Sequence, residues 1–558
     1  MKTTNKTSIR SLIDICFQRG LRDIVFSPGS RNAPLVIGFN ADDRFTTYCI
    51  PDERVAGFFA LGISLKKQIP CMLCCTSGSA SLNYAPAICE AYYQNIPLLV
   101  LTADRPENKI DQGVGQSMRQ KDVYVNYING SYQISSSQDS YSLSQNIRIV
   151  NEAISLSFSK NGPVHINIPL VEPLYLLSEY LAETHQLNTQ IENAYSFKLE
   201  PRLKDIYLSS EKKIVIVGQS FPIDKLQDIL NTISNKEDIV LLTETCANIY
   251  TSKGIQCIDR VLTGVSQNEE MYRPDLLIYI GGQIISKKII RYFSDFPADK
   301  QWYVNQDKVQ DTFETLTDHI ATDTLSFVQS LAELNSPNHK SYIDKWYELN
   351  HSIRIGHNSY IRNIAFSDLA VFNFLLTHIP EYNVLHVSNS SAIRYVQLFN
   401  QRKDLVYHAN RGVSGIDGST STAMGYSIVS DKQNIFITGD ISFFYDSNAF
   451  WHPHQPNNLK VILINNSGGG IFRIIDGPST SEHLEQFFEA HHELKAEKFA
   501  DTYGLEYFKA EDMKSLTSVF TEFINSSKPN IQLLEVVTPR KENSEVLKDY
   551  FKTISKLS

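Results

Sequence analysis

The sequence predicts an α/β protein of three tandem open domains, each with a parallel sheet flanked by helices. Length is one reason, because 558 residues allow three or four domains at about 150 residues each. The second reason is a repeated order of short apolar run, polar turn and helical pattern, which is typical of parallel sheets covered by helices. The third is that irregular or charged stretches interrupt this order. We therefore expect domains at residues 1–180, 200–340 and 360–558.

The composition narrows the classes of partner. Hydrophobic residues make up 42% and charged residues 20% of the chain, which is ordinary for a globular protein. The formal net charge of −9 argues against nucleic acid as a partner, because phosphate binding needs a basic surface. Any anionic ligand must then be held by a few well-placed cationic side chains.

We expect no targeting or membrane segment. Residues 1–20 interrupt their apolar positions with Arg, Asp and Gln, so they lack the ~7–15-residue apolar core of a signal peptide. No stretch approaches the ~18 uninterrupted apolar residues of a membrane span. These features predict a cytoplasmic protein without a membrane partner.

Within residues 1–180, three apolar runs have the character of strands that end in polar turns. The predicted strands with their turns are 22–27 before Pro28-Gly29-Ser30, 71–75 before Ser77-Gly78-Ser79 and 97–103 before Asp104-Arg105-Pro106. Segments 53–65 and 80–94 have helical spacing, and the apolar run 163–170 closes the unit before the irregular stretch 175–201. Because strand, turn and helix alternate in this order, we expect the strands to be parallel.

The same order recurs twice further along the chain. Strand-like runs occur at 213–218, 239–244 and 275–282 in the middle domain, and at 382–391, 404–412, 434–440, 459–470 and 532–537 in the third. A charged helical segment at 342–355 separates the two sets. In open parallel sheets, ligands collect beyond the carboxyl ends of the strands, so functional residues are expected directly after these runs.

Two runs of the third domain end in oxygen-bearing residues. Run 434–439 is followed by Asp440, and run 459–465 is followed by Asn466 and the glycines 468–470. A carboxylate, an amide and a free backbone carbonyl suit a hard cation such as magnesium, which takes oxygen ligands. Asp, Asn and Gly are also the ordinary residues of turns. The residues alone leave both interpretations open.

One carboxylate and four arginines are further candidates. Glu53 opens a helical pattern, where a carboxylate also stabilises the first turn. The arginines that follow predicted strands are Arg31, Arg105, Arg394 and Arg411. A planar guanidinium group can bind a carboxylate through two parallel hydrogen bonds, so these four arginines are candidates to bind an acidic substrate. Unrelated surface arginines, or ion pairs that brace loops, would explain the same pattern.

The spacing of Gly439-Asp440 and Asn465-Asn466 resembles the diphosphate and metal motif of the thiamine-diphosphate-dependent enzymes. The resemblance implies that the Asp440 and Asn466 side chains and the Gly468 carbonyl bind Mg²⁺ or Mn²⁺ together with the cofactor thiamine diphosphate. It also implies that Glu53 meets the aminopyrimidine ring of the cofactor as a general acid and base. Ile416 would be the apolar residue that bends the cofactor, and an ordinary core isoleucine is the alternative.

Five segments narrow the resemblance to a branch of this family that works in menaquinone biosynthesis. They are SPGSRNAPL at 27–35, DERVAGFFALG at 52–62, TSGSASLNYAPAICEAYYQNIPLLVLTADRPE at 76–107, NRGVSGIDGSTSTA at 410–423 and GDISFFYDSNAF at 439–450. The resemblance implies decarboxylation of 2-oxoglutarate and addition of the resulting succinic semialdehyde unit to isochorismate. It further implies a homodimer or homotetramer, with each cofactor between the first domain of one subunit and the third domain of another.

Matching positions assign ten residues to a substrate pocket. They are Ser30, Arg31, Arg105, Gln116, Lys287, Ser390, Arg394, Arg411, Ile471 and Phe472. Both substrates are dianions, so a pocket with several arginines is chemically reasonable. Lys287 is chosen over the adjacent Lys288, and a solvated lysine pair is the alternative. The middle domain lacks a GxGxxG motif after a strand, so no bound flavin is expected.

Two rival functions remain. Another thiamine-diphosphate enzyme, such as an acetolactate-synthase-like protein or a 2-oxoacid decarboxylase, would need a pocket with fewer arginines. A binding protein without catalytic activity would hold a nucleotide in the Ser77-Gly78-Ser79 turn, at a helix N-terminus. The presence of Glu53 together with Asp440, Asn466 and Gly468 disfavours this second rival.

Overall fold

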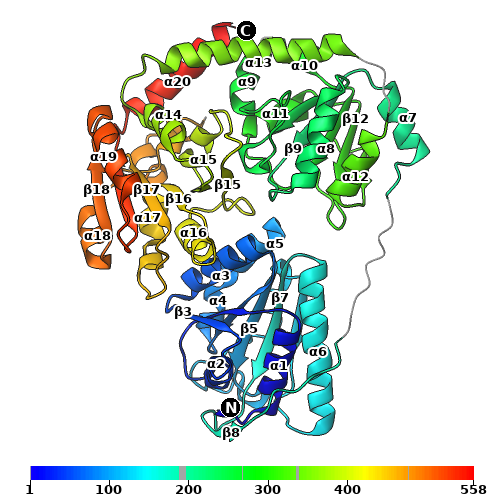
Figure 1. Cartoon of the computed structure of the whole chain (residues 1–558), viewed down its shortest axis with the longest axis vertical. Helices are drawn as coiled ribbons and strands as arrows, with labels where there is room; N and C mark the ends of the chain where they lie inside the picture. Colours follow the sequence, from blue (N-terminus) through cyan, green and yellow to red (C-terminus); the bar gives the residue numbers. More distant parts are fainter. Residues whose placement is uncertain (1, 188–196, 267, 335–338, 476, 558) are drawn as a thin grey trace.

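The computed structural model describes residues 2–187, 197–266, 268–334, 339–475 and 477–557. Its strands form three larger sheets flanked by helices, coloured blue to cyan, green, and yellow to red in Figure 1. The predicted α/β class is thereby confirmed. The exact domain boundaries stay a prediction, and residues 188–196 of the predicted linker lie outside the described residues.

The first sheet has six strands in the order β3-β2-β4-β5-β7-β6, and every neighbouring pair is parallel. These strands are β2 (Asp23–Phe26), β3 (Thr46–Cys49), β4 (Cys71–Cys75), β5 (Leu98–Asp104), β6 (Gly130–Gln133) and β7 (Pro163–Pro169). Its helices are α1 (Thr7–Gln18), α2 (Ala33–Asn40), α3 (Glu53–Lys67), α4 (Ser79–Asn83), α5 (Ala85–Gln94) and α6 (Ser140–Ser159), with short 3₁₀ turns η1 (Glu107–Lys109) and η2 (Val125–Tyr127). The short strands β1 (Lys2–Thr4) and β8 (Leu177–Glu179) pair with each other antiparallel.

The helix predicted at 80–94 is in fact two helices, α4 and α5. Pro86 lies in the first turn of α5. A proline there lacks the N–H that would continue a preceding helix, but its fixed backbone angle suits the start of a new one. The predicted helix at 53–65 is confirmed as α3, and Asp52 caps it by accepting from the amides of Arg54 and Val55.

The middle sheet has five parallel strands in the order β10-β9-β11-β12-β13. They are β9 (Lys213–Val217), β10 (Val240–Thr243), β11 (Leu276–Ile280), β12 (Lys300–Val304) and β13 (Asp318–Ile320). The helices are α7 (Pro201–Ser209), α8 (Asp224–Asn235), η3 (Thr245–Ala247), α9 (Ile258–Val265), α10 (Glu269–Tyr272), α11 (Lys287–Asp295) and α12 (Thr324–Ala332), and the long α13 (Lys340–Ile361) leads to the third sheet.

The third sheet repeats the strand arrangement of the first, in the order β15-β14-β16-β17-β19-β18, again all parallel. Its strands are β14 (Val384–Val387), β15 (Val406–His408), β16 (Asn434–Gly439), β17 (Leu459–Asn465), β18 (Glu506–Ala510) and β19 (Gln532–Val537). Its helical elements are α14 (Asp368–His378), α15 (Ser391–Val396), α16 (Ser419–Ser427), α17 (Asp440–Tyr445), η4 (Ser447–Phe450), η5 (Gly470–Arg473), η6 (Pro478–Thr480), the π-helical turn η7 (Leu484–Phe488), α18 (Glu497–Tyr503), α19 (Met513–Asn525), α20 (Glu542–Ile554) and η8 (Ser555–Leu557).

Helices α3 and α16 hold corresponding places in the first and third sheets, and they pack against each other where the two domains meet (Figure 1). The helices approach so closely that glycine is required. A Cβ at Gly62 would lie 2.1 Å from the carbonyl oxygen of Thr422, and a Cβ at Gly425 would lie 1.9 Å from that of Phe59. Glycine at these positions on both helices therefore allows the first and third domains to pack this closely.

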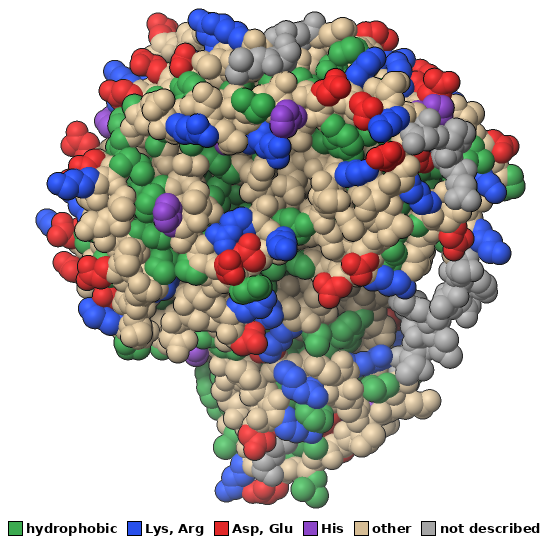
Figure 2. Space-filling model, turned by 45° about the horizontal axis from the view of Figure 1, so that its top comes forward, with side chains coloured by type: hydrophobic (Ala, Val, Ile, Leu, Met, Phe, Trp, Pro, Cys, Tyr) green, Lys and Arg blue, Asp and Glu red, His purple; other side chains and the backbone are tan. Residues whose placement is uncertain are grey.

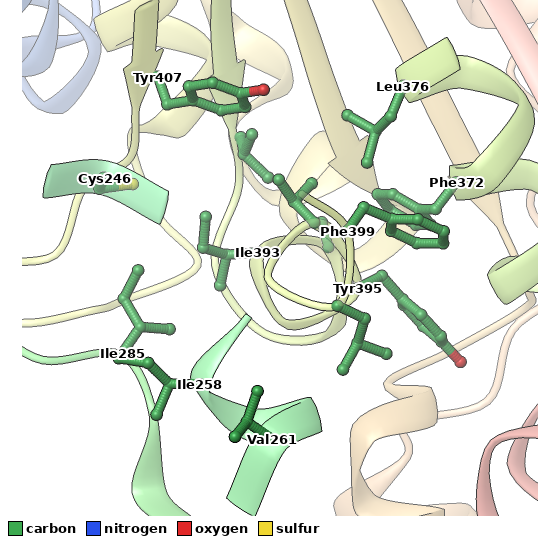
Figure 3. Packing of buried hydrophobic residues seen from close by; sticks show 14 of the residues in the cluster. Cys246, Ile258, Val261, Ile285, Phe372, Leu376, Ile393, Tyr395, Phe399 and Tyr407 are labelled. Atoms are coloured by element: carbon green, nitrogen blue, oxygen red, sulfur yellow. The ribbon is translucent and has the colours of Figure 1, made fainter. Parts of the chain in front are cut away.

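The middle and third domains share one hydrophobic core (Figure 3). Ile258, Val261 and Ile285 of the middle domain group with Ile393 and Phe399 of the third, and all five are buried. Burial of apolar surface is the main stabilising contribution to such a contact. The relative position of these two domains is therefore fixed by packing as well as by the chain connection.

Acidic and basic side chains are interspersed over the face of the molecule drawn in Figure 2. Among the described helices, none has the length and apolar character needed to cross a membrane.

Candidate functional site

Asp440 and Asn466 lie at the carboxyl edge of the third sheet, after the paired parallel strands β16 and β17. Asp440 is the first residue of α17, and both side chains are buried. The amide of Gly468 donates to Asp440 Oδ2 at 2.9 Å. Gly468 has φ +151, a backbone angle that favours glycine. The three residues predicted to bind a metal are thus brought together by two neighbouring strand ends.

Sequence reasoning missed Asp368, which completes this cluster. Its carboxylate accepts from Asn466 Nδ2 at 2.9 Å and from Thr538 Oγ1 at 2.6 Å. Burial raises the pKa of Asp368 to about 6 despite these hydrogen bonds. Because the Asn466 amide nitrogen is engaged by Asp368, the amide is oriented by this contact. The sequence signal for Asp368 was only its place after Ser367 at the start of a helix, which does not reveal its distant partners.

A cavity of about 300 Å³ opens in front of this cluster. The predicted residues that line it are Ser390, Ile416, Asp440, Asn466, Gly468 and Phe472. The glycine turn forms a tight cradle, since a Cβ at Gly468 would lie 2.9 Å from the Glu489 carbonyl oxygen. Carboxylate, amide and carbonyl oxygens are the ligands of a hard cation, so this donor set fits the predicted diphosphate and metal site. The predicted donor set contains only one carboxylate, so it is not a cluster of His, Cys, Asp or Glu side chains. No group of three or more such side chains suited to a metal occurs among the described residues.

A second cavity of about 430 Å³ adjoins the first, and Ser391 lines both. It lies between the middle and third domains. Its cationic lining is Lys287, Lys288, Arg291 and Arg394, with Ile471 on the apolar side. The predicted wall residues Ile471 and Phe472 therefore face different cavities.

Both lysines of the predicted pair line this second cavity. Lys288 donates to the carbonyl of Asp259 at 3.3 Å and lies 3.5 Å above the ring of Phe551. Desolvation lowers the pKa of the Lys288 amine. By surface exposure the two lysines do not differ, since both Lys287 and Lys288 are exposed. The choice of Lys287 as the residue that faces substrate stays a prediction.

Arg411 is a buried residue of the third domain, and it lies near residues of both the first and the middle domain. Its Nη1 donates to Asn389 Oδ1 at 2.9 Å. The two residues that follow it, Gly412 and Val413, donate their amides to the carboxylate of Glu90 in the first domain at 2.7 and 2.8 Å. The loop that carries Arg411 is therefore fixed from the first domain. Sequence reasoning missed Glu90 because its partners are 322 and 323 residues away.

The first-domain candidates form a second group at the ends of β2 and β5. Burial lowers the pKa of Arg31, and the positive charge of Arg105 lowers it further. Arg31 also pairs with Glu172 at 3.0 Å, and Arg105 donates to the Gly115 carbonyl at 3.0 Å.

Two other candidates lie on exposed parts of the first-domain loops. Ser30 and Gln116 are exposed. The carbonyl of Gln116 accepts from Ser77 Oγ at 2.8 Å. This contact joins the loop of Gln116 to the turn that the nucleotide-binding alternative would use.

Glu53 is the first residue of α3 and is half-buried. Burial raises the pKa of its carboxyl group above the ordinary value. Neither of the two cavities has a described first-domain residue in its lining. Within one chain, the predicted site residues thus fall into a first-domain group and a group from the middle and third domains.

Three known protein families match successive parts of the chain. Residues 7–123 match the family described as "Thiamine pyrophosphate enzyme, N-terminal TPP binding domain", residues 176–387 match "Middle domain of thiamine pyrophosphate", and residues 389–536 match "Thiamine pyrophosphate enzyme, C-terminal TPP binding domain". Thiamine pyrophosphate is another name for thiamine diphosphate.

Individual relatives cover nearly all of the chain. A protein of Flavobacterium johnsoniae is 41% identical over 98% of this chain and 98% of its own length. Proteins of Porphyromonas gingivalis and Bacteroides thetaiotaomicron are 37% and 34% identical, over 99% and 98% of this chain and 98% and 99% of theirs. All three are named 2-succinyl-5-enolpyruvyl-6-hydroxy-3-cyclohexene-1-carboxylate synthase. By these matches the chain belongs to the thiamine pyrophosphate enzyme family, in the group of its 2-succinyl-5-enolpyruvyl-6-hydroxy-3-cyclohexene-1-carboxylate synthases.

Proposed function

We propose that this chain decarboxylates 2-oxoglutarate with thiamine diphosphate and adds the succinic semialdehyde unit to isochorismate. The product would be 2-succinyl-5-enolpyruvyl-6-hydroxy-3-cyclohexene-1-carboxylate, a precursor of menaquinone. The observation that carries the proposal is the pair of adjoining cavities that share Ser391, one beside Asp440 and Asn466 and the other lined by lysines and arginines. Full-length similarity to relatives named for this product supports the same assignment.

The first cavity is the proposed place of the cofactor diphosphate and of Mg²⁺ or Mn²⁺. Asp440, Asn466 and the Gly468 carbonyl would hold the metal, and Ile416, which lines the same cavity, would contact the cofactor. When bound, thiamine diphosphate supplies a nucleophilic carbon and an electron sink for decarboxylation. Glu53 would hold and return a proton at its carboxyl group, a role that its raised pKa suits.

The cationic side chains would bind the substrates. Each substrate carries two carboxylates, and a guanidinium group binds a carboxylate through two parallel hydrogen bonds. Arg394 and the lysine pair line the second cavity, whereas Arg31 and Arg105 lie together in the first domain. Because the net charge of the chain is −9, capture must depend on these local cations rather than on the field of the whole protein.

We further propose that the working form is a homodimer or a pair of such dimers. Glu53 and Arg31 are absent from the described lining of both cavities. A second copy would bring its own first-domain group to the third-domain cavity, so that each site contains residues of two subunits. Sedimentation of the protein with cofactor tests this: a monomer that is fully active would contradict it.

The direct test is a reaction with both substrates. The purified protein is mixed with 2-oxoglutarate, isochorismate, thiamine diphosphate and Mg²⁺, and the products are identified by mass. We expect the coupled product, and we expect the matched variant Asp440→Asn to form little of it. Free succinic semialdehyde without coupling would support a decarboxylase instead. Stabilisation by ATP, with no effect of thiamine diphosphate and Mg²⁺, would favour the nucleotide-binding alternative.

A further inference from the structure

Glu489 is a buried residue that packs against the glycine turn 468–470 with both its main chain and its side chain. Its exposed fraction is 1%. Its carbonyl oxygen accepts from the Gly469 amide at 2.6 Å. A Cβ at Gly468 would lie 2.9 Å from this oxygen and 3.0 Å from the side-chain Cγ of Glu489. The turn that carries the predicted metal-binding carbonyl therefore rests directly on Glu489.

Two arginines hold the carboxylate of Glu489 from different parts of the third domain. Arg473, the last residue of η5, donates from Nε at 2.7 Å and from Nη2 at 2.6 Å. Arg540, which follows β19, donates from Nε at 3.2 Å and from Nη2 at 2.6 Å. Two bidentate guanidinium partners satisfy a carboxylate that would otherwise be costly to bury. Glu489 is thus anchored to the sheet through Arg540.

The same turn also touches a predicted substrate-wall residue. A Cβ at Gly469 would lie 3.2 Å from Cδ2 of Phe472. The ring of Phe472 lies 6.1 Å from that of Phe488, the neighbour of Glu489. A displacement of Glu489 would therefore reach both the turn that carries the predicted metal-binding carbonyl and the wall of the first cavity.

We propose that Glu489 is a positioning residue that fixes the 468–470 turn for metal binding. The inference rests on the proposed metal site at Asp440, Asn466 and Gly468. A turn with three glycines has much conformational freedom, and a ligand on a mobile turn must lose that freedom when the metal binds. Because Glu489 is anchored by two arginines, it restricts the turn in the metal-free protein, so less conformational entropy is lost when the metal binds.

The chain offers a matched control in Glu485. Its carboxylate contacts the same two arginines, Arg473 at 2.9 Å and Arg540 at 3.3 Å. Its side chain is 54% exposed, and the glycine turn packs against Glu489 rather than against it. Loss of the Glu485 charge therefore perturbs the same arginines but leaves the Glu489 carboxylate, which anchors the residue under the turn, paired with them.

The test measures metal affinity without turnover. The full chain is saturated with thiamine diphosphate, no substrate is added, and free Mn²⁺ is followed by electron paramagnetic resonance during a titration. We expect Glu489→Gln to raise the Kd for Mn²⁺ at least tenfold, and Glu485→Gln to change it less than twofold. Thermal unfolding of each variant identifies the folded fraction, and a purely structural role would lower Tm while leaving the Kd of folded protein unchanged.

The outcomes separate the inference from the proposed function. Mn²⁺ binding by the wild type, together with equal affinities for Glu489→Gln and Glu485→Gln, would overturn the role of Glu489 and leave the metal site standing. No Mn²⁺ binding by the wild type would overturn the metal site and this inference with it. If Glu489→Gln does not fold, Arg540→Gln removes one anchor and leaves Arg473 in place. We expect that variant to weaken Mn²⁺ binding about threefold, and an unchanged Kd would again contradict the proposal.

Discussion

The carboxylate of Glu90, in the first domain, accepts a hydrogen bond of 2.7 Å from the main-chain amide of Gly412, in the third. The amide of Val413 donates to the same carboxylate at 2.8 Å. Glu90 is buried, and a Cβ at Gly412 would lie 2.6 Å from its carbonyl oxygen. The loop that presents Arg411 is therefore held by a residue of another domain.

We expect Glu90→Gln to impair substrate binding through Arg411. A glutamine has only one carbonyl oxygen to accept from the two main-chain amides, and its NH₂ group would face the other amide. One hydrogen bond to a charged acceptor is therefore lost, which costs about 1.5–3 kcal/mol. The KM for one of the two substrates should rise about tenfold or more, while the Kd for thiamine diphosphate stays the same. Glu152→Gln, at an exposed carboxylate of α6, is the control. Equal KM values in wild type and Glu90→Gln would contradict this role.

The proton-holding role assigned to Glu53 is tested by Glu53→Gln. The amide cannot exchange a proton with the aminopyrimidine ring, but it keeps nearly the same shape. We expect this variant to fold, to bind thiamine diphosphate, and to lose at least ~10²-fold in the rate of cofactor C2 proton exchange, a typical size for general acid–base catalysis. Exchange is followed by NMR in heavy water. A rate equal to that of the wild type would remove Glu53 from the mechanism.

The close approach of α3 and α16 predicts that Gly425→Ala is strongly destabilising. The new methyl group would meet main-chain atoms of Phe59, which cannot move as a flexible side chain can. Overpacking of this kind costs about 1–3 kcal/mol, and more where the backbone must shift. Urea unfolding measures the loss. Gly115→Ala is the control, because no atom lies within 4 Å of its added Cβ, and similar midpoints for both variants would argue against the required contact.

Glu244 predicts a pH dependence of stability. Burial, and then repulsion from Asp259, raise the pKa of Glu244 from 4.5 to about 8. The folded state therefore binds this proton more tightly than the unfolded state does, and the stability gained is present at low pH and lost as the pH rises through about 8. The free energy of unfolding should therefore fall as the pH rises from 4.5 to about 8, and it should level off above that.

The variant Glu244→Gln checks this assignment. Its amide oxygen can still accept from the Ser286 amide, which lies 3.0 Å from the carboxylate in the wild type. Tm measured from pH 5 to 9 should fall less steeply in the variant than in the wild type. Parallel curves would show that Glu244 does not carry the effect.

Much of the fold could be predicted because local patterns encode it. The strands β4, β5, β16 and β17 are largely apolar, and each is buried along its whole length or nearly so. The edge strands β3, β6, β13 and β18 were missed, since they are short, partly polar and partly exposed. The inner strand β12 was missed as well, although it is mostly buried. The split between α4 and α5 was also missed, although Pro86 gave a local signal for it.

The sequence by itself determined the α/β class, the strand ends that carry Asp440 and Asn466, and the family to which the chain belongs. Only the tertiary structure decided which distant residues support these ends. Asp368 accepts a hydrogen bond from Asn466, which is 98 residues away in the sequence, and Glu90 accepts one from Gly412, which is 322 residues away. Glu489 binds both Arg473 and Arg540. The physical reason is that apolar periodicity reports which face of an element is buried, whereas a polar contact between elements depends on how whole sheets and helices pack together.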